Sequence, residues 1–383
     1  MNLHNYKSPL FLQQKFHREI EALTKITNSL MKKEENQQRK RILLTGASGS
    51  VGRETLQKLL MNAQYHVTVF DVETKNSKKI FSKLASRVNI YFGDISKKED
   101  VEKAVKNQDF IIHLAAIIPP FADENPELTR KVNVIGTQNI VEAMEKYSPN
   151  AFLLYSSSVS VYGDRLLNPE IKVNDVLQPS LGDYYGETKL ECERIIQNSA
   201  INWSIFRLSA IMGNHKISKL MFHMPLKTQM EICTTKDTGN AFALAIEHQH
   251  KLNEKIFNLG GGDNCVVAYD EFLSKMFQLY GLGKLNFPET AFAEKNYHCG
   301  IYSDGNDLQE ILHFRNDDLN SFYQNQERKI SGIQKAATRL LSPFIKRYLL
   351  SKSEPFEAFK TRNKVKMEQF FNSKSAMTKN SFA

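Results

Sequence analysis

From Arg41 onward, the chain alternates short apolar runs with segments whose apolar positions recur every three or four residues. The apolar runs are RILLTG, HVTVFDV, VNIYFGDI, DFIIHLAA, AFLLYSSS and NWSIFRLSAIMG. Between them lie segments with helical periodicity, such as RETLQKLLMNA, NVIGTQNIVEAMEKY and YYGETKLECERIIQNSA. Nearly continuous apolar strands that alternate with helices are typical of a parallel sheet covered on both faces. The predicted fold class is therefore α/β, with a doubly wound parallel sheet.

The same pattern divides the chain into four predicted parts. The periodicity of residues 10–33 predicts an amphipathic helix, and the alternation of strands and helices becomes irregular beyond Gly213. We expect the end of the chain after Lys360 to be frayed. The parts are an N-terminal helical extension (1–39), a sheet domain (40–213), a smaller lobe interleaved with the sheet (214–326) and a basic helical extension (327–383).

The formal net charge of +9 comes from the two ends of the chain. Residues 1–41 hold nine basic and four acidic residues, and residues 327–383 hold thirteen and four. The middle, 42–326, is mildly acidic, with 29 basic and 34 acidic residues. Because phosphate binding needs a clustered basic face, we expect no nucleic-acid partner. The basic C-terminal segment is predicted to pack on the body or on another subunit, and peripheral contact with a membrane surface is the alternative.

Neither a membrane span nor a metal site is indicated. No apolar run reaches the roughly 18 to 20 residues that a spanning helix needs, and the N-terminus lacks a signal-peptide pattern. The cysteines have no C-x-x-C or other metal-binding spacing, which predicts reduced thiols and a cytoplasmic location. They are Cys192, Cys233, Cys265 and Cys299.

A glycine-rich segment joins the first predicted strand to the helix that follows it. Gly46, Gly49 and Gly52 in TGASGSVG are spaced G-x-x-G-x-x-G. A pyrophosphate needs backbone N–H groups close by, which a Cβ would block, and the helix N-terminus adds partial positive charge. The segment predicts a Rossmann-type dinucleotide site, in which the contacting loop residues are Gly46, Ser48, Gly49, Ser50, Val51 and Gly52.

An acidic residue at the end of the next predicted strand supports this interpretation. Asp71 ends the apolar part of HVTVFDV, about 20 residues after the last glycine of the loop. A carboxylate there accepts hydrogen bonds from the adenosine ribose hydroxyls and repels a 2′-phosphate. We therefore expect NAD as the cofactor, and Arg53 leaves NADP as the alternative.

A second constellation indicates acid–base chemistry. Tyr185 and Lys189 in DYYGETKLECE are four residues apart, so a helix places the phenol and the ammonium group on one face. A free tyrosine has a pKa of about 10, and a neighbouring ammonium together with a positive nicotinamide ring would stabilise its phenolate. The pair is a candidate for proton exchange with a substrate alcohol or ketone. Three serines that end an upstream strand, in YSSSVSVYG, are candidates to hold the substrate oxygen.

Together these motifs resemble the extended short-chain dehydrogenase/reductase superfamily, the NAD-dependent epimerase/dehydratase group. The resemblance runs from about Lys40 to Gly262, with the motifs in the family's order. They are TGASGSVG, GDI, HLAA, NVIGT, YSSSVSVYG, YGETK and IFNLGGG.

The resemblance implies a role for each matching residue. Tyr185 is implied as the acid/base, Lys189 lowers its pKa and binds the nicotinamide ribose, and Ser158 bonds the reacting oxygen, with Ser157 as the alternative. It also implies a homodimer formed through helices that begin near Val134 and Tyr184. Besides the glycine loop and Asp71, the cofactor contacts implied are Asp94, Ile95, Leu114, Ala115, Ala116, Asn133, Ser156, Tyr185 and Lys189.

The sequence departs from the family where the substrate would bind. Nucleotide-sugar epimerases commonly have an aromatic residue, an asparagine and a proline after the arginine at position 207, whereas Leu208 to Ile211 follow Arg207 here. Dehydration is disfavoured, because Val159 and Ser160 stand where dehydratases often have an Asp-Glu pair. His298 and Cys299 are candidates to line a pocket, although a structural hairpin is the preferred interpretation.

The predicted function is an NAD-dependent oxidoreductase or epimerase. Hydride passes between the nicotinamide and a carbinol or ketone carbon of a small-molecule substrate, and a tyrosine exchanges the proton. The sequence leaves open whether the net reaction is redox or epimerisation. The alternatives are a nucleotide-sugar epimerase and a non-catalytic NAD-binding sensor or scaffold.

Overall fold

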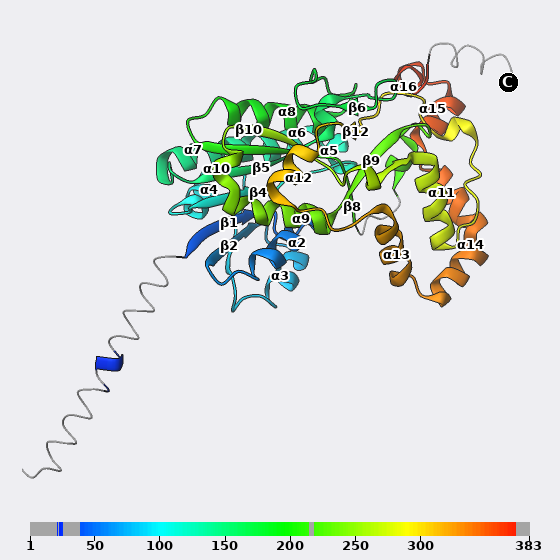
Figure 1. Cartoon of the computed structure of the whole chain (residues 1–383). Coiled ribbons are helices and arrows are strands. Elements are labelled where there is room, and N and C mark those ends of the chain that lie inside the picture. Colours follow the sequence, from blue (N-terminus) through cyan, green and yellow to red (C-terminus); the bar gives the residue numbers. More distant parts are fainter. Residues whose placement is uncertain (1–20, 22, 26–38, 214–217, 373–383) are drawn as a thin grey trace, which may run out of the picture.

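A seven-stranded parallel sheet forms the centre of the protein (Figure 1). The computed structural model describes residues 21, 23–25, 39–213 and 218–372, so most of the helix predicted over 10–33 lies outside the described residues. In sheet order the strands are β10 (Lys255–Leu259), β7 (Asn202–Leu208), β5 (Phe152–Ser158), β4 (Phe110–His113), β1 (Lys40–Thr45), β2 (Tyr65–Asp71) and β3 (Asn89–Phe92).

The strands are apolar because helices cover both faces of the sheet. Ile42, Leu43 and Leu44 of β1 are completely buried. Because successive side chains of a strand point to opposite faces, both faces of the sheet must be covered at β1. One face packs against α2 (Ser50–Leu59), α3 (Lys75–Phe81), α9 (Thr235–Leu244), α10 (Gln249–Leu252) and α12 (Asn306–Leu312). The other packs against α4 (Lys98–Val105), α7 (Gly136–Tyr147) and α8 (Tyr184–Gln197).

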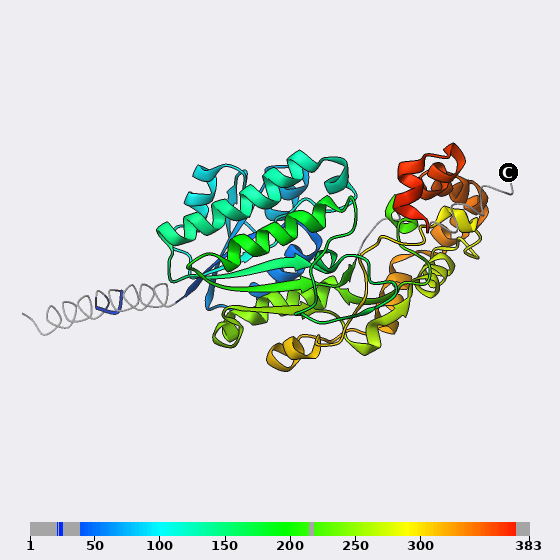
Figure 2. The same cartoon turned by 90° about the horizontal axis from the view of Figure 1, so that it is seen from above.

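These two helical layers lie above and below the sheet in Figure 2. The predicted doubly wound α/β fold is therefore confirmed. Between β4 and β1 the order of the strands along the chain reverses, because β2 and β3 lie on one side of β1, and β4, β5, β7 and β10 lie on the other. In doubly wound sheets, ligands bind at such a switch point, beyond the carboxyl ends of the strands.

A second apolar core lies beside the main sheet. It contains side chains of the three-stranded sheet β11 (Val266–Ala268), β9 (Gln229–Thr234) and β8 (Ala210–Met212), and of the helices α11 (Tyr269–Tyr280), α13 (Leu319–Lys329) and α14 (Gly332–Leu350). The short strand β6 (Glu170–Ile171) pairs with β12 (Ile301–Tyr302), and Ile171 and Tyr302 belong to a small apolar cluster of their own. The helices α5 (Phe121–Glu124) and α6 (Pro126–Arg130) follow β4.

The basic C-terminal segment packs on the body, as predicted, but only through one of its faces. Leu349 of α14 joins the second core, whereas Ile333, Leu340, Phe344 and Tyr348 form an exposed apolar stripe on the opposite face. Among the described residues, no helix has the length and apolarity that crossing a membrane requires.

The frayed end predicted after Lys360 is wrong as far as the described residues reach. The helices α15 (Glu354–Thr361) and α16 (Lys364–Phe370) pack together, and Phe370 and Phe371 are buried. The carbonyl of Phe370 also accepts a hydrogen bond of 2.7 Å from the backbone N–H of Glu294. Composition did not predict this packing, because the segment is rich in basic residues and only a few apolar side chains hold the end of the chain in place.

Candidate active site

The glycine loop between β1 and α2 is a place of close backbone approach. Gly46 has a φ of +67°, and a Cβ there would lie 2.7 Å from the backbone nitrogen of Ala115. A Cβ on Gly52 would lie 2.2 Å from the carbonyl oxygen of Gly46, so neither position accepts a side chain without a backbone shift. Gly49 caps α2 without a capping side chain. The loop residues that remain partly or fully exposed are Gly46, Ser48, Gly49, Ser50 and Val51.

Asp71 lies at the end of β2, beside this loop. Its Oδ2 accepts a hydrogen bond of 2.8 Å from the backbone N–H of Ser48, and its Oδ1 accepts one of 2.9 Å from Val72. A carboxylate has about four acceptor positions, so two hydrogen bonds leave capacity for a ligand hydroxyl. The carboxylate that the sequence singled out is thus held against the loop and stays partly exposed.

Asp94 and Ile95 follow β3 and occupy different environments. Asp94 Oδ1 accepts hydrogen bonds from the N–H and the hydroxyl of Ser96, at 2.9 and 2.8 Å. Burial alone would raise the pKa of Asp94, but the hydrogen bonds from Ser96 outweigh it and hold the pKa below its ordinary value. Ile95 is buried and its side chain packs against Gly136, so it belongs to the core beneath α7. Only Asp94 of this pair is partly exposed.

A chain of hydrogen bonds positions the backbone after β4. Thr137 donates to the carbonyl of Asn133, so its oxygen accepts from Nε2–H of His113 at 3.1 Å. His113 Nδ1 then accepts from the hydroxyl of Thr45 at 2.8 Å, and burial lowers the pKa of this imidazole to about 3, which keeps it neutral. Thr45 in turn accepts from the backbone N–H groups of Leu114 and Ala115, at 3.2 and 3.1 Å. Leu114, Ala115 and Ala116 are partly exposed at this sheet edge.

Asn133 and Ser156, two further predicted cofactor contacts, are engaged inside the protein. Asn133 lies in a π-helical turn (Lys131–Ile135) and is 1% exposed. Its side-chain amide bonds both backbone groups of Ile117, at 2.8 and 3.1 Å, and donates to Thr188 at 3.1 Å. Ser156 is buried and donates to the carbonyl of His113 at 3.2 Å. The structure shows both residues holding the framework of the site.

Tyr185 and Lys189 lie on one face of α8, as their spacing predicts. Lys189 is 1% exposed, its Nζ donates to the carbonyl of Ser156 at 2.6 Å, and it lies 5.6 Å from the ring centroid of Tyr185. Burial lowers the pKa of Lys189 to about 8. Burial and the charge of Asp183 raise the pKa of Tyr185 above its ordinary value, and a side-chain hydrogen bond with Ser158 only partly offsets this. The chain alone therefore does not stabilise the phenolate.

The structure separates the three serines at the end of β5. Ser158 lies at the rim of a cavity, interacts with Tyr185 and caps the 3-10 helix Val159–Tyr162 by accepting from Ser160 at 3.2 Å. Ser157 points to the other side of the strand, is 1% exposed and donates to the carboxylate of Glu193. Strand alternation thus puts Ser158 at the cavity and Ser157 in the core.

Arg207 and Glu193 form a buried ion pair behind the site. Their side chains are 3% and 0% exposed, and Arg207 Nη2 lies 2.7 Å from Glu193 Oε2. Arg207 also donates to the hydroxyl of Tyr162 at 2.7 Å and to the carbonyl of Val173 at 2.8 Å. All these partners belong to the chain itself, so Arg207 fixes β7 against α8 instead of facing the cavity.

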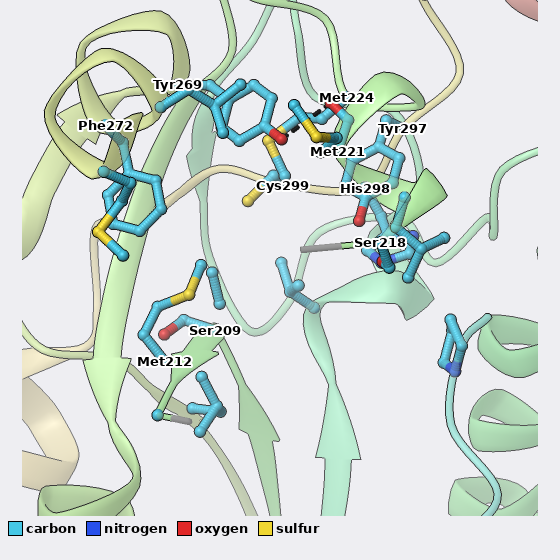
Figure 3. A pocket seen from close by; sticks show the side chains of 18 of the residues that line it. Ser209, Met212, Ser218, Met221, Met224, Tyr269, Phe272, Tyr297, His298 and Cys299 are labelled. Atoms are coloured by element: carbon cyan, nitrogen blue, oxygen red, sulfur yellow. Dashed lines mark hydrogen bonds between the residues drawn. The ribbon is translucent and has the colours of Figure 1, made fainter. Parts of the chain in front are cut away.

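A cavity of about 530 Å³ opens between the end of β5 and the second core (Figure 3). Ser158 and Val159 lie at one side of it, and α11 lies at the other. His298 and Cys299 line it, so the structural hairpin preferred from the sequence is wrong. The segment that carries them makes one isolated bridge, between Asp164 and His298.

His298 belongs to a charged cluster that the sequence did not reveal. Its Nδ1 lies 2.6 Å from Oδ2 of Asp183, which is also the N-cap of α8. Burial lowers the pKa of His298, but Asp183 and Asp123 outweigh it and hold the pKa above its ordinary value. Burial and the charge of Asp183 raise the pKa of Asp123 to about 6, although a hydrogen bond from the backbone of Tyr185 opposes them. Nothing in the spacing of these residues brings them together, because α5, the N-terminus of α8 and the segment before β12 supply one each.

The comparisons with known proteins identify the family and the fold. A family model described as "NAD dependent epimerase/dehydratase family" matches residues 42–260. The human sterol-4-alpha-carboxylate 3-dehydrogenase, decarboxylating, is 29% identical over 170 residues, which are 44% of this chain and 42% of that protein. The UDP-glucose 4-epimerase of Pisum sativum is 30% identical over 195 residues, 47% of this chain and 55% of that protein. The matches thus span about half the length of these relatives.

A solved structure shows the same fold over a larger part of the chain. The UDP-glucuronic acid 4-epimerase of Bacillus cereus, solved with UDP-glucuronic acid and NAD, superposes with a TM-score of 0.63 at 20% identity. The superposition covers 76% of this chain and 99% of that one. At this identity the likeness concerns the fold alone.

Proposed function

We propose a hydride-transfer function from one premise: the chain belongs to the NAD-dependent epimerase/dehydratase family. Hydride passes between the nicotinamide of NAD and a carbinol or ketone carbon of a small molecule, while Tyr185 exchanges the hydroxyl proton. The observation that carries this proposal is the placement of Ser158, Tyr185 and Lys189 on two adjacent elements, with Ser158 at the rim of the cavity.

The glycine loop and its surroundings fit a dinucleotide. Gly46 and Gly52 lie where a Cβ would collide with backbone, and the capping position of α2 carries no side chain, so its first N–H groups are open to a pyrophosphate. In this proposal Asp71 would hold the adenosine ribose, Asp94 would contact the adenine, and residues 114–116 would line the cofactor. NAD supplies the hydride acceptor and a positive charge beside the tyrosine.

Ser158, Tyr185 and Lys189, here called the triad, each have a separate role. Lys189 stays in place because its Nζ is bonded to the carbonyl of Ser156, and from there it binds the nicotinamide ribose. Ser158 donates to the substrate oxygen, which aligns that oxygen with the phenol of Tyr185. The raised pKa of Tyr185 keeps its phenol protonated in the free protein, and a positive charge bound beside it would lower this pKa and ease the transfer of the proton.

Paired serine variants test the function. We expect Ser158→Ala to lower kcat by about 10²-fold or more, because a donor aimed at the reacting oxygen is lost. Ser157→Ala should leave kcat nearly unchanged, since Ser157 faces Glu193. NADH absorbance and epimer formation are measured over a panel of secondary alcohols and UDP-sugars. Equal losses in both variants would contradict the role given to Ser158.

The two alternatives are weaker. A nucleotide-sugar epimerase shares the triad, and the relative from Pisum sativum bears that name. Arg207, however, is held in the buried ion pair with Glu193. Residues 208–211, which follow it, include no side-chain amide that could bind a nucleotide. A non-catalytic sensor or scaffold would not need a serine, a tyrosine and a lysine grouped beside a cavity.

Asp71 variants test the choice of cofactor. Asp71→Ala should weaken NAD binding by about 10- to 100-fold, through the loss of charge-assisted hydrogen bonds, and should relax the discrimination against NADP. Asp71→Asn is the matched control, because its Oδ1 can still accept from Ser48 while the repulsive charge is removed. Calorimetric titration with both cofactors gives the affinities. Tighter binding of NADP by the unmodified protein would show that the cofactor is wrongly assigned.

A further inference from the structure

The cavity beside Ser158 is bounded mainly by hydrocarbon and sulfur. Its far wall is one side of α11, which contributes Phe272, Leu273, Met276, Phe277 and Tyr280. The near walls add Met212, Met221 and Met224, which Figure 3 shows around the same space as Tyr269 and Phe272. At about 530 Å³ it lies within the range of about 300 to 1,000 Å³ for small-molecule sites.

The described residues that line this cavity include no lysine, arginine, aspartate or glutamate. Of these lining residues, His298 has the one basic side chain, and its Nδ1 lies 2.6 Å from Oδ2 of Asp183. Lys219, close to the cavity residues Ser218 and Leu220, forms ion pairs of 2.7 Å with both Glu124 and Glu354. A nucleoside diphosphate carries negative charge that would be desolvated here, and no lysine or arginine among the described lining residues balances it.

Two serines at the ends of the adjacent strands β5 and β7 line the cavity. Ser158 lies at the rim, and Ser209, at the end of β7, also lines the cavity. The hydroxyl oxygen of Ser209 is buried and has no hydrogen-bond partner among the described residues. A buried hydroxyl of this kind is costly to leave unpaired, so it is placed to bond a ligand. Further polar side chains of the lining are Ser218, Tyr269, Tyr280, Tyr297 and His298. The hydroxyl of Tyr269 already donates to the carbonyl of Met221 at 2.9 Å.

From this arrangement we propose that the substrate is an uncharged secondary alcohol or ketone on an apolar ring or chain scaffold, without a nucleotide. The inference rests on the proposed hydride transfer at Ser158 and Tyr185. The reacting oxygen lies at the end of the cavity near β5, between Ser158 and Tyr185, with Ser209 bonding a second oxygen or the same one. The hydrocarbon scaffold extends toward α11. The four methionines make the wall adaptable, so that scaffolds of several shapes fit.

The test uses the full-length protein with NAD and two sets of compounds. One set contains a 3-hydroxysteroid, a cyclic terpene alcohol and a series of 2-alkanols of increasing length. The other contains UDP-glucose and UDP-glucuronic acid. We expect NADH formation with the first set only, and kcat/KM should rise roughly fourfold for each added methylene while the cavity accommodates the chain.

A charged substitution in the wall tests the site itself. Met276→Arg should raise the KM of the apolar alcohols by about tenfold or more, because an arginine desolvates poorly there. The control is Met61→Arg, at a position 76% exposed just after α2, which should change nothing. NAD affinity and the thermal midpoint of Met276→Arg verify that the variant is folded. Displacement of the uncharged dye Nile red measures cavity binding without turnover.

The outcomes of these experiments distinguish failure of the proposed substrate class from failure of the proposed function. Reaction of UDP-sugars, with no binding of the apolar alcohols, overturns the substrate class and leaves hydride transfer intact. A second outcome is that the alcohols displace the dye from the unmodified protein but not from Met276→Arg, and that no NADH forms. This outcome supports the binding of alcohols in the cavity and overturns the proposed hydride transfer. Failure of every alcohol to displace the dye or to react overturns the substrate class.

Discussion

Replacement of Tyr185 by phenylalanine is expected to lower kcat by about 10²- to 10⁴-fold and to leave NAD affinity nearly unchanged. In the proposed function the phenol exchanges the proton of the substrate oxygen, whereas Ser158 would contact the substrate and Lys189 the cofactor independently of that phenol. Lys189 keeps its position in the variant, because the carbonyl of Ser156 and the ring of Tyr155 hold its Nζ. Removal of the hydroxyl should therefore lower kcat while the position of Lys189 and the affinity for NAD stay nearly the same.

The neighbouring tyrosine provides the control. Tyr184 precedes Tyr185 in α8 and is exposed, so Tyr184→Phe should keep full activity. Steady-state kinetics with the best substrate and calorimetric titration with NAD separate chemistry from binding. Activity of Tyr185→Phe within a few-fold of the unmodified protein would remove Tyr185 from its role.

The largest effect on stability is expected from Glu193→Ala. This substitution leaves the guanidinium of Arg207 buried without its carboxylate and removes the acceptor of Ser157. Removal of one partner of a buried pair costs about 3 to 5 kcal/mol in the free energy of unfolding. Urea unfolding with an unchanged m-value measures the loss as a lower midpoint.

A second pair on the same helix calibrates this result. Glu191 of α8 pairs with Arg130 at the surface, and Glu191→Ala should cost no more than about 1 kcal/mol. The double variant Glu193→Leu with Arg207→Met should recover part of the loss, because both charges leave the core together. If Glu193→Ala proves no more destabilising than Glu191→Ala, the buried pair does not stabilise the fold as argued.

The sheet and the cofactor loop were predictable because local patterns determine them. Apolar runs between periodic helices indicate a parallel sheet, and the glycine spacing reflects backbone contacts that follow directly from a strand joined to a helix. Tyr185 and Lys189 were found for the same reason, since residues four apart on a helix always share a face.

The substrate side of the site could not be predicted in the same way. The cavity wall comes from α11, the loop before β9 and residues 297–299, which meet only through tertiary packing. Asn133 and Ser156 have family spacing, yet they face the framework, because their orientation depends on loops that no local pattern describes. The choice between Ser157 and Ser158 needed one fact that the motif lacked, namely which face of β5 meets α8.

The packing of α9 on α2 has a consequence for synthesis of the chain. Gly239 of α9 sits so close to α2 that a Cβ would lie 2.7 Å from the backbone nitrogen of Thr55. A growing chain that already contains α2 must be extended by about 180 residues before α9 exists to cover this face. Until then, Leu56 and Leu59 lack part of the surface that buries them in the finished protein. Shortened forms that stop before α9 would expose apolar surface, so the sheet half is unsuited to production on its own.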